Sequence, residues 1–343
     1  MHPTHQRIID AVIAKADRVC PDSLALIGVY GSAATGDVHA KSDLDLLILI
    51  KDDAGWQLGS GFILDDAGIG YDIYCTNWEG LEGEAACSHA HLTKLMDSNI
   101  VYVRDEEALV RLEVLRKQAA ETLASDARLE KAQTLMDNVK KAYADCFLAE
   151  TLSQVRFCAG GVLYDLLDAV MLFNGTYFRK GVKRTFEELT ALNLPFDLPK
   201  MVLDVVRGDS VEEIRTAVTR MLRTVQDYMA RPAQKQAPDA GLAGTYEEMF
   251  SNWRNKMGEA AERGDVFASF MNLLSFDFMY GGIASEVEMC KPDLMGRFDP
   301  HDLRANEALF DDALRSYHAV YQAAGIEVRH YANVEEFAAD YLK

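Results

Sequence analysis

Residues 24–50 read LALIGVYGSAATGDVHAKSDLDLLILI. The first seven residues are apolar and predict a buried strand, which ends where Gly31 and Ser32 form a turn. Ten residues after this turn, Asp43 and Asp45 open a second apolar run. The stretch therefore predicts two neighbouring strands, with a glycine turn at the end of the first and two acids at the start of the second.

The two acids at the start of the second strand have a fixed relationship. Side chains on a strand alternate between its faces, so Asp43 and Asp45 should share one face, about 7 Å apart, while Leu44 enters the core. Two carboxylates this close repel each other unless a cation lies between them, and carboxylate oxygens are ligands that divalent cations prefer. The alternative is a solvated strand edge without a metal.

A third acid follows on a further predicted strand. Residues 69–76 (IGYDIYCT) alternate as a strand and carry Asp72. If this strand lies beside the second one, Asp72 completes a group of three carboxylates. It is otherwise a solvent-facing acid. In the turn, glycine lets a ligand approach the backbone closely, and the N–H of Ser32 at a helix start can hold phosphate oxygens.

Together these residues resemble the nucleotidyltransferase superfamily of polymerase β and kanamycin nucleotidyltransferase. Its motif is a hydrophobic residue, a Gly-Ser or Gly-Gly pair, an acid-x-acid sequence and a later acid on another strand. Tyr30, the Gly31-Ser32 pair, the Asp43-Leu44-Asp45 sequence and Asp72 match each part in order. The resemblance covers about the first 112 residues and fades beyond them into a similarity with members that carry a helical tail.

The resemblance implies a site and a reaction. Two Mg²⁺ ions, with Asp43 and Asp45 as shared ligands, would bind the triphosphate of ATP or another nucleoside triphosphate. Asp72 would be the ligand nearest the acceptor hydroxyl, and Gly31 and Ser32 would hold the β- and γ-phosphates. The hydroxyl attacks the α-phosphorus and pyrophosphate leaves, a reaction in which metal ions neutralise charge on both sides.

Composition bears on the acceptor. The chain has 343 residues, 49% of them apolar, and a net charge of −19. Proteins that bind a nucleic-acid backbone usually carry a basic patch, and no run of Lys and Arg of that kind occurs, so we expect no nucleic-acid partner. An acidic surface suits a cationic small molecule, although acidity also simply aids solubility.

Other features predict a cytoplasmic protein. Its six cysteines are scattered and indicate reduced thiols. The first sixteen residues predict an amphipathic helix without the apolar core of a signal peptide. We expect no apolar run long enough to span a bilayer, and no membrane partner. The oligomeric state stays open.

The length and the change of pattern along the chain predict an α+β catalytic domain, with a mixed sheet and flanking helices, followed by an all-α helical region. After Asp72 we expect a helix over 78–96, a strand over 100–103 and a helix from 105. The expected domains are residues 1–112, 113–232 and 245–343, with a linker near 230–245. Further long helices are predicted at 124–147, 152–173, 211–229, 247–263, 265–290 and 305–324.

One segment of the helical region is a further candidate site. After a predicted helix that ends at an Asn-Gly pair, Lys180, Lys183 and Arg184 gather in an otherwise acidic chain. This segment loosely resembles one that tailed nucleotidyltransferases bring to the triphosphate, although cations are also common at a helix C-terminus. On the same helix, Asp165 and Asp168 lie three residues apart and share a face, where they could recognise an amine, act as a base or simply be solvated.

The sequence thus predicts a Mg²⁺-dependent nucleotidyltransferase. It would move a nucleoside monophosphate, AMP from ATP in the leading form, to a hydroxyl of a small molecule, with aminoglycoside-like or lincosamide-like acceptors as the nearest analogies. Two alternatives remain open. One is a transferase that nucleotidylates a protein side chain, as antitoxin-like members do, and the other is a nucleotide-binding regulator without turnover.

Overall fold

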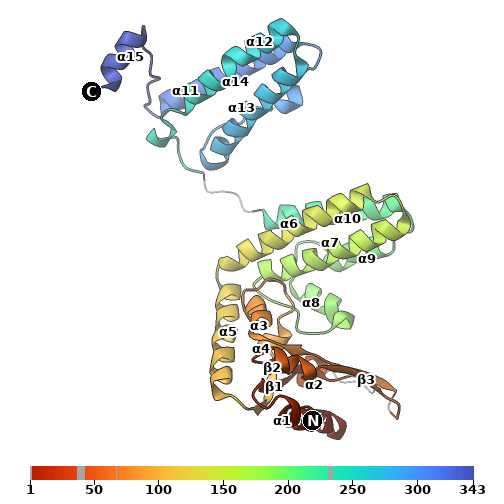
Figure 1. Ribbon diagram of the computed structural model, residues 1–343. Helices are drawn as coiled ribbons and strands as arrows, with labels where there is room; N and C mark the ends of the chain where they lie inside the picture. The colour runs from red at the N-terminus through yellow and green to blue at the C-terminus, as the bar shows by residue number, and fades with distance from the viewer. Residues whose placement is uncertain (1, 37–42, 67, 231–234) are drawn as a thin grey trace. The chain divides into compact units, whose positions relative to one another are not determined.

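The computed structural model describes residues 2–36, 43–66, 68–230 and 235–343. It divides into two compact units, Met1–Ala230 and Arg231–Lys343 (Figure 1). The first unit contains all the β-structure in named strands and both groups of predicted site residues. The second unit is helical, and each unit is described by itself.

A four-stranded sheet forms the centre of the catalytic part, in the order β5-β2-β1-β6. The middle strands β1 and β2 pair antiparallel, with Tyr30 opposite Asp45. β6 pairs antiparallel with the other edge of β1, and β5 pairs parallel with β2. A separate antiparallel hairpin joins β3 and β4. The strand bounds are β1 Leu24–Tyr30, β2 Asp45–Ile50, β3 Ser60–Leu64, β4 Ile69–Ile73, β5 Cys75–Thr76 and β6 Asn99–Val103.

Helices cover both faces of this sheet (Figure 1). On one face α1 (Pro3–Val19) packs its apolar stripe against the even-numbered residues of β2, such as Leu46 and Ile48. On the other face Leu47 and Leu49 pack into a core shared with the helices that follow the sheet. The two faces of one strand thus belong to two different cores, which fixes the register of β2. The shorter helices here are α2 (Gly31–Thr35), α3 (Trp78–Ala85), α4 (Thr93–Met96) and the 3₁₀ turn η1 (Asp53–Leu58).

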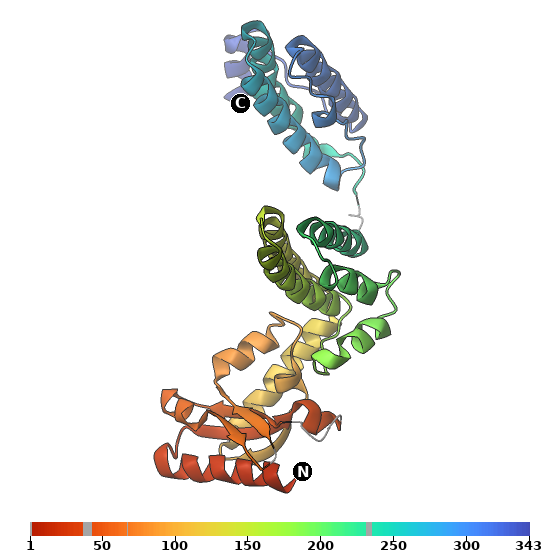
Figure 2. The same ribbon diagram turned by 90° about the vertical axis from the view of Figure 1, so that its right-hand side faces the viewer.

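The long helix α5 (Glu106–Ala124) joins the catalytic part to the helices behind it. It packs on α3, α4 and β1 and also contacts α6, so its buried residues belong to one continuous core. In that core α6 and α7 lie side by side and α10 packs against them (Figures 1 and 2). The bounds are α6 Ala127–Leu148, α7 Leu152–Phe173, η2 Val182–Arg184, α8 Thr185–Ala191, α9 Leu198–Val206 and α10 Val211–Met229.

The second unit is built on three longer helices with an aromatic core, in which Phe276, Tyr280, Phe310 and Tyr317 are buried. Its helices α12, α13 and α14 each contact the other two. The bounds are η3 Ala240–Leu242, α11 Thr245–Met249, the π-helical turn η4 Phe250–Arg254, α12 Asn255–Arg263, α13 Val266–Glu286, η5 Met295–Arg297, α14 Leu303–Ala323 and α15 Val334–Tyr341.

The α+β domain followed by an all-α region is confirmed. Several details of the prediction are wrong. The helix expected over 78–96 is broken into α3 and α4, because Cys87 adopts a positive φ of 51° and the following loop bonds to α7. The strand expected over 69–76 is interrupted at Tyr74, and α13 ends at Glu286 rather than at residue 290. The hairpin strand β3 and the helices α8 and α9 were not predicted.

Two further expectations concern the domain boundaries and the apolar helix α13. The boundary expected at residue 112 falls inside α5, while the expected linker includes residues 231–234, which lie outside the described residues. Among the residues that the structure describes, α13 is long and apolar enough to cross a membrane by length and composition alone. The expectation that no run reaches such a length therefore does not hold for this helix.

Candidate active site

The site begins at the end of β1, where Gly31 opens α2 with a φ of +64°. This left-handed conformation suits glycine, because a side chain there is strained. The position is also sterically closed, since a Cβ on Gly31 would lie 2.0 Å from Oδ2 of Asp45. The turn therefore packs directly onto the first acid of β2, and only glycine fits.

Asp45 is held in this place by the turn. Its carboxylate accepts a hydrogen bond from the backbone N–H of Ser32, and it is half-buried. Burial raises the pKa of Asp45, the charge of Asp43 raises it further, and the Ser32 N–H opposes both effects. The site thus contains two neighbouring carboxylates, one of which ionises less readily than an ordinary aspartate.

Asp43 differs from the prediction in one respect. β2 begins at Asp45, so Asp43 precedes the strand and is exposed rather than being a strand residue. It follows residues 37–42, which lie outside the described residues. Its charge still acts on Asp45 and on the buried hydroxyl of Tyr30, whose pKa is raised by burial first and by the nearby carboxylates second.

Asp72 lies on β4, in the hairpin that is separate from the four-stranded sheet. Its neighbours Tyr71 and Ile73 are buried in the same core as Leu46, so Asp72 points away from that core. The parallel pairing of β2 with β5 joins Ile48 to Cys75 and Leu49 to Thr76, so it begins three residues after Asp72.

Asp72, the third predicted carboxylate, does not form a metal site with Asp43 and Asp45 among the described residues. Asp72 is exposed and accepts a hydrogen bond from the Tyr74 hydroxyl, which raises the pKa of Tyr74. Within the described parts of the chain, no group of three or more His, Cys, Asp or Glu side chains is arranged to hold a metal ion. Asp43 and Asp45 form a pair, and Asp72 as third ligand stays a prediction.

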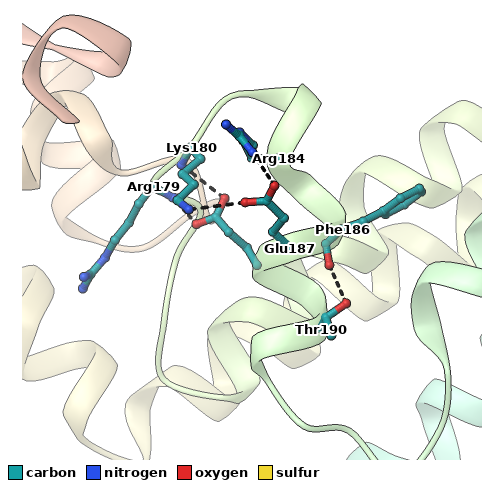
Figure 3. Close-up of polar contacts among 7 residues, drawn as sticks. Arg179, Lys180, Arg184, Phe186, Glu187 and Thr190 are labelled. Carbon is teal, nitrogen blue, oxygen red and sulfur yellow. Dashed lines mark hydrogen bonds and ion pairs between the residues drawn. The ribbon is translucent and has the colours of Figure 1, made fainter. Parts of the chain in front are cut away.

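The predicted basic segment follows α7 and includes η2 (Figure 3). Lys180 Nζ lies 3.5 Å from Glu187, and Arg184 donates to the same carboxylate at 2.5 Å. The backbone N–H groups of Arg179 and Lys180 donate to Glu188. Residues 179–188 contain four cations and two acids, so the segment keeps a net charge of +2 within an acidic chain.

This segment is anchored to the catalytic part just before its cations begin. The Tyr177 hydroxyl donates to Asp97 Oδ1 at 2.9 Å, and the Phe178 N–H donates to the carbonyl of Ala90 at 2.8 Å. Burial, followed by Asp97, raises the pKa of Tyr177 to about 12, so the hydroxyl stays protonated and remains a donor. The segment is therefore tethered to the chain on both sides of α4, at Ala90 before that helix and at Asp97 after it.

Asp168 strengthens the same junction from α7. Its buried carboxylate accepts the N–H of Ala90 at 3.0 Å through Oδ2. Its Oδ1 lies 3.3 Å from Nε2 of His91, an ion-pair contact when His91 is protonated, although the angle is not that of a hydrogen bond. Burial raises the pKa of Asp168, while Ala90 and His91 oppose that effect.

These contacts bear on the predicted acceptor site. The burial of Asp168 argues against direct contact with an acceptor, and it makes this residue a link between α7 and the catalytic part. Asp165 is half-buried, and burial together with the charge of Asp168 raises its pKa. Sequence patterns predicted no role for His91 and did not reveal the Tyr177–Asp97 contact, because the partners of both contacts lie about eighty residues apart and no local spacing signals them.

Comparison with known proteins supports the class of domain. Residues 14–78 match the family model described as a nucleotidyltransferase domain, a span that contains Gly31, Asp43, Asp45 and Asp72. The chain therefore carries a nucleotidyltransferase domain and is an enzyme of that class.

One solved structure is similar to this chain at low sequence identity. A nucleotidyltransferase-like protein from Exiguobacterium sibiricum 255-15, solved by crystallography, is similar over 82% of this chain and 88% of its own, with 14% identity and a TM-score of 0.37. A likeness at this level does not define a shared arrangement of the whole chain. No curated protein matches the sequence.

Proposed function

We propose that this enzyme transfers a nucleoside monophosphate, AMP from ATP in the leading form, to a hydroxyl group of a small-molecule acceptor, and that it requires Mg²⁺. The observation that carries the proposal is the closure of the Gly31 turn onto Asp45, with the charge of Asp43 beside it. The nucleotidyltransferase domain supports nucleotidyl transfer in general. The identities of the nucleotide, the metal and the acceptor are what we propose.

The residues present fit a divalent cation. The raised pKa of Asp45 reports an unfavourable charge that a cation next to Asp43 and Asp45 would relieve. These two carboxylates would hold the Mg²⁺ ions, with Asp72 as the ligand nearest the acceptor. When bound, Mg²⁺ neutralises charge on the transferring phosphoryl group and on the leaving oxygen.

The other parts of the site would bind and orient the nucleotide. The absent side chain of Gly31 leaves room for the Asp45 carboxylate to lie over the turn, where it would face the metal-bound triphosphate. Because the Ser32 N–H is bonded to Asp45, a phosphate contact from Ser32 would come from its hydroxyl rather than from its amide. Lys180, Lys183 and Arg184, on a segment tethered to the catalytic part, would supply positive charge to the β- and γ-phosphates.

The nature of the acceptor rests on charge. A chain with a net charge of −19 favours a cationic acceptor over a polyanion. Asp165 is the more accessible of the two predicted acceptor-binding acids, and a carboxylate next to an ammonium group gains a charge-assisted hydrogen bond. Asp168, three residues after Asp165, would instead hold α7 against the catalytic part through its hydrogen bond from the Ala90 N–H.

The test is to incubate the protein with Mg²⁺, ATP and a panel of hydroxylated and amine-rich compounds, and to measure the masses of compounds and protein. The proposal expects pyrophosphate and one compound class heavier by one AMP. Added nucleotide on protein alone would favour the protein-modifying alternative. Nucleotide binding without any product from ATP, GTP, CTP or UTP would favour the regulator.

A further inference from the structure

The Tyr74 hydroxyl lies next to the acid that is predicted to face the acceptor. Tyr74 directly follows β4 and comes two residues after Asp72, so the two side chains project from the same side of the chain. The Asp72 carboxylate accepts a hydrogen bond from the Tyr74 hydroxyl. In the proposed function Asp72 is the ligand nearest the hydroxyl that attacks ATP. The chain itself therefore carries a hydroxyl group in that position.

Tyr74 is accessible, unlike the other tyrosines near the predicted acids. It is 67% exposed, whereas Tyr71, on the opposite side of β4, is 4% exposed and packs in the core with Leu46. Tyr30, opposite Asp45, is partly buried in the other core. Tyr74 belongs to neither β4 nor β5, so its backbone lies between two strand pairings rather than inside one. A nucleotide can therefore approach the phenolic oxygen of Tyr74 from solvent.

Glycines flank the Asp72 carboxylate on the same side of the hairpin. Asp72 is paired with Gly61 of β3, where a Cβ would lie 3.7 Å from Asp72 Oδ1. Gly70 precedes Asp72 by two residues, and a Cβ there would meet none of the described residues within 4 Å. Along β4 it is thus Tyr74 whose side chain reaches the carboxylate. The two glycines leave space beside this pair for the phosphates of a nucleotide.

We propose that Tyr74 is a modification site, to which the enzyme transfers AMP within its own chain when no small-molecule acceptor lies next to Asp72. This inference rests on the proposed function, because it uses the same carboxylates and the same nucleotide. A tyrosine hydroxyl is a nucleophile that enzymes use to form covalent products. Its hydrogen bond to Asp72 holds it close to the predicted acceptor position before any substrate arrives, which favours transfer.

The reaction is an exchange of oxygens at phosphorus. The Tyr74 oxygen attacks the α-phosphorus of ATP, and the new O–P bond forms as the bond from this phosphorus to the bridging oxygen of pyrophosphate breaks. The phenolic proton passes along the existing hydrogen bond to the Asp72 carboxylate. The products are pyrophosphate and a phosphodiester that joins AMP to Tyr74. Because the modified residue lies where the acceptor is predicted to bind, Tyr74 and the acceptor compete.

Mass spectrometry tests the modification directly. Full-length protein incubated with ATP and Mg²⁺, without an acceptor, should become heavier by one AMP, and peptide mapping should place it on Tyr74. Tyr74→Phe and Asp45→Asn should each lose the added mass. Tyr331→Phe is the matched control, because the Tyr331 hydroxyl also donates to an aspartate, Asp340, at 2.9 Å, and it should keep the added mass. AMP on another residue, or AMP retained by Tyr74→Phe, would overturn the proposal. Circular dichroism verifies that the variants fold.

A mixing experiment tests whether transfer occurs within one chain. Asp45→Asn keeps the Tyr74 hydroxyl but should not catalyse, whereas Tyr74→Phe keeps the three acids but lacks the hydroxyl. Because Tyr74 is bonded to Asp72 of its own chain, a mixture of the two variants should gain no AMP. For the same reason, the rate constant for modification of the native protein should not change with protein concentration. AMP on the Asp45→Asn chain would contradict transfer within one chain.

Competition separates failure of this inference from failure of the proposed function. Increasing amounts of an acceptor identified from the compound panel should reduce AMP on Tyr74 of the native protein while AMP on the compound increases. If the native protein modifies the compound but gains no AMP without it, modification of Tyr74 is wrong and the proposed function stands. If Tyr74 gains AMP and no compound does, the inference stands and the small-molecule acceptor is wrong. A protein that forms neither product contradicts both.

Discussion

Gly31 and Asp45 are in such close contact that the first side-chain carbon of any other residue at position 31 would lie 2.0 Å from the Asp45 carboxylate. Gly31 directly follows β1 and Asp45 begins β2. The antiparallel pairing that sets Tyr30 opposite Asp45 brings the two residues together. The glycine of the motif therefore has a structural purpose apart from any ligand. It allows the acid of β2 to lie over the turn.

Gly31→Ala should abolish nucleotidyl transfer, because the new methyl group displaces Asp45. Gly36→Ala is the matched control, since Gly36 also has a positive φ, of 76°, but a new Cβ there would meet none of the described residues within 4 Å. Both variants should lose about 1–2 kcal/mol from backbone strain. Steady-state kinetics and chemical denaturation would check this, and similar activity losses in both would show that strain alone is responsible.

Asp45→Asn should stabilise the metal-free protein at pH 7. The raised pKa of Asp45 means that ionisation costs more in the folded chain than in the unfolded one. Its unfavourable contribution is absent below the ordinary aspartate pKa of about 3.9, develops as the pH rises through the folded value, and persists above it. The Tm advantage of the variant should therefore vanish near pH 3.

Mg²⁺ gives the complementary measurement. Ligands that bind the folded state raise its Tm, so Mg²⁺ should stabilise the native protein and have little effect on Asp45→Asn. A variant that is less stable than the native protein at pH 7 without metal would contradict the view that burial, together with the charge of Asp43, disfavours ionisation of Asp45. Calorimetry with and without chelator distinguishes the cases.

Replacing Lys180 or Arg184 with Ala should weaken ATP binding by roughly tenfold or more, which corresponds to a charge-assisted contact of about 1.5–3 kcal/mol. AMP binding should hardly change, because the contact is to the outer phosphates. Lys140→Ala, which breaks a similar exposed ion pair with Asp137 on α6, is the control. Equal loss for ATP and AMP in isothermal titration would leave only local pairing with Glu187 as the role of these cations.

Tyr177→Phe should also weaken ATP binding, although Tyr177 itself precedes the cations. The variant removes the hydrogen bond to Asp97 and so loosens the basic segment, and loss of a buried partner costs about 1–3 kcal/mol of stability. Tyr143→Phe, the control, removes a comparable contact between α6 and Thr219 of α10. If both variants change ATP affinity equally, the junction does not position the segment.

The sequence predicted those parts of the site that lie on regular elements and are close in the chain. Period-two alternation predicted correctly that Asp45 and Asp72 each point away from the core that buries their neighbours, because burial of every second residue is a strong constraint on a strand. That Asp72 joins Asp45 in one site stays a prediction. The glycine turn also follows from local chemistry. The expectation that Asp43 is a strand residue failed because pairing with β1 starts opposite Tyr30, so the strand begins two residues later.

What could not be predicted depends on contacts between distant residues. The break between α3 and α4 follows from Asp168 and Phe178, which bond to both sides of Ala90 from the helical region. No local pattern in residues 86–92 carries that information. The basic segment differs, because its contacts are local: Glu187 pairs with Lys180 and with Arg184 three residues before it, and Glu188 accepts the backbone N–H groups of Arg179 and Lys180.

The central claim is that Asp43 and Asp45 support transfer of a nucleoside monophosphate, and pyrophosphate release measures it most directly. Native protein, Asp43→Asn and Asp45→Asn are compared with ATP, Mg²⁺ and an acceptor identified from the panel. Each variant keeps the shape of the site and removes one charge, so release should fall at least about a hundredfold while the fold survives. Near-native release by either folded variant would contradict the assignment of this pair as the catalytic metal ligands.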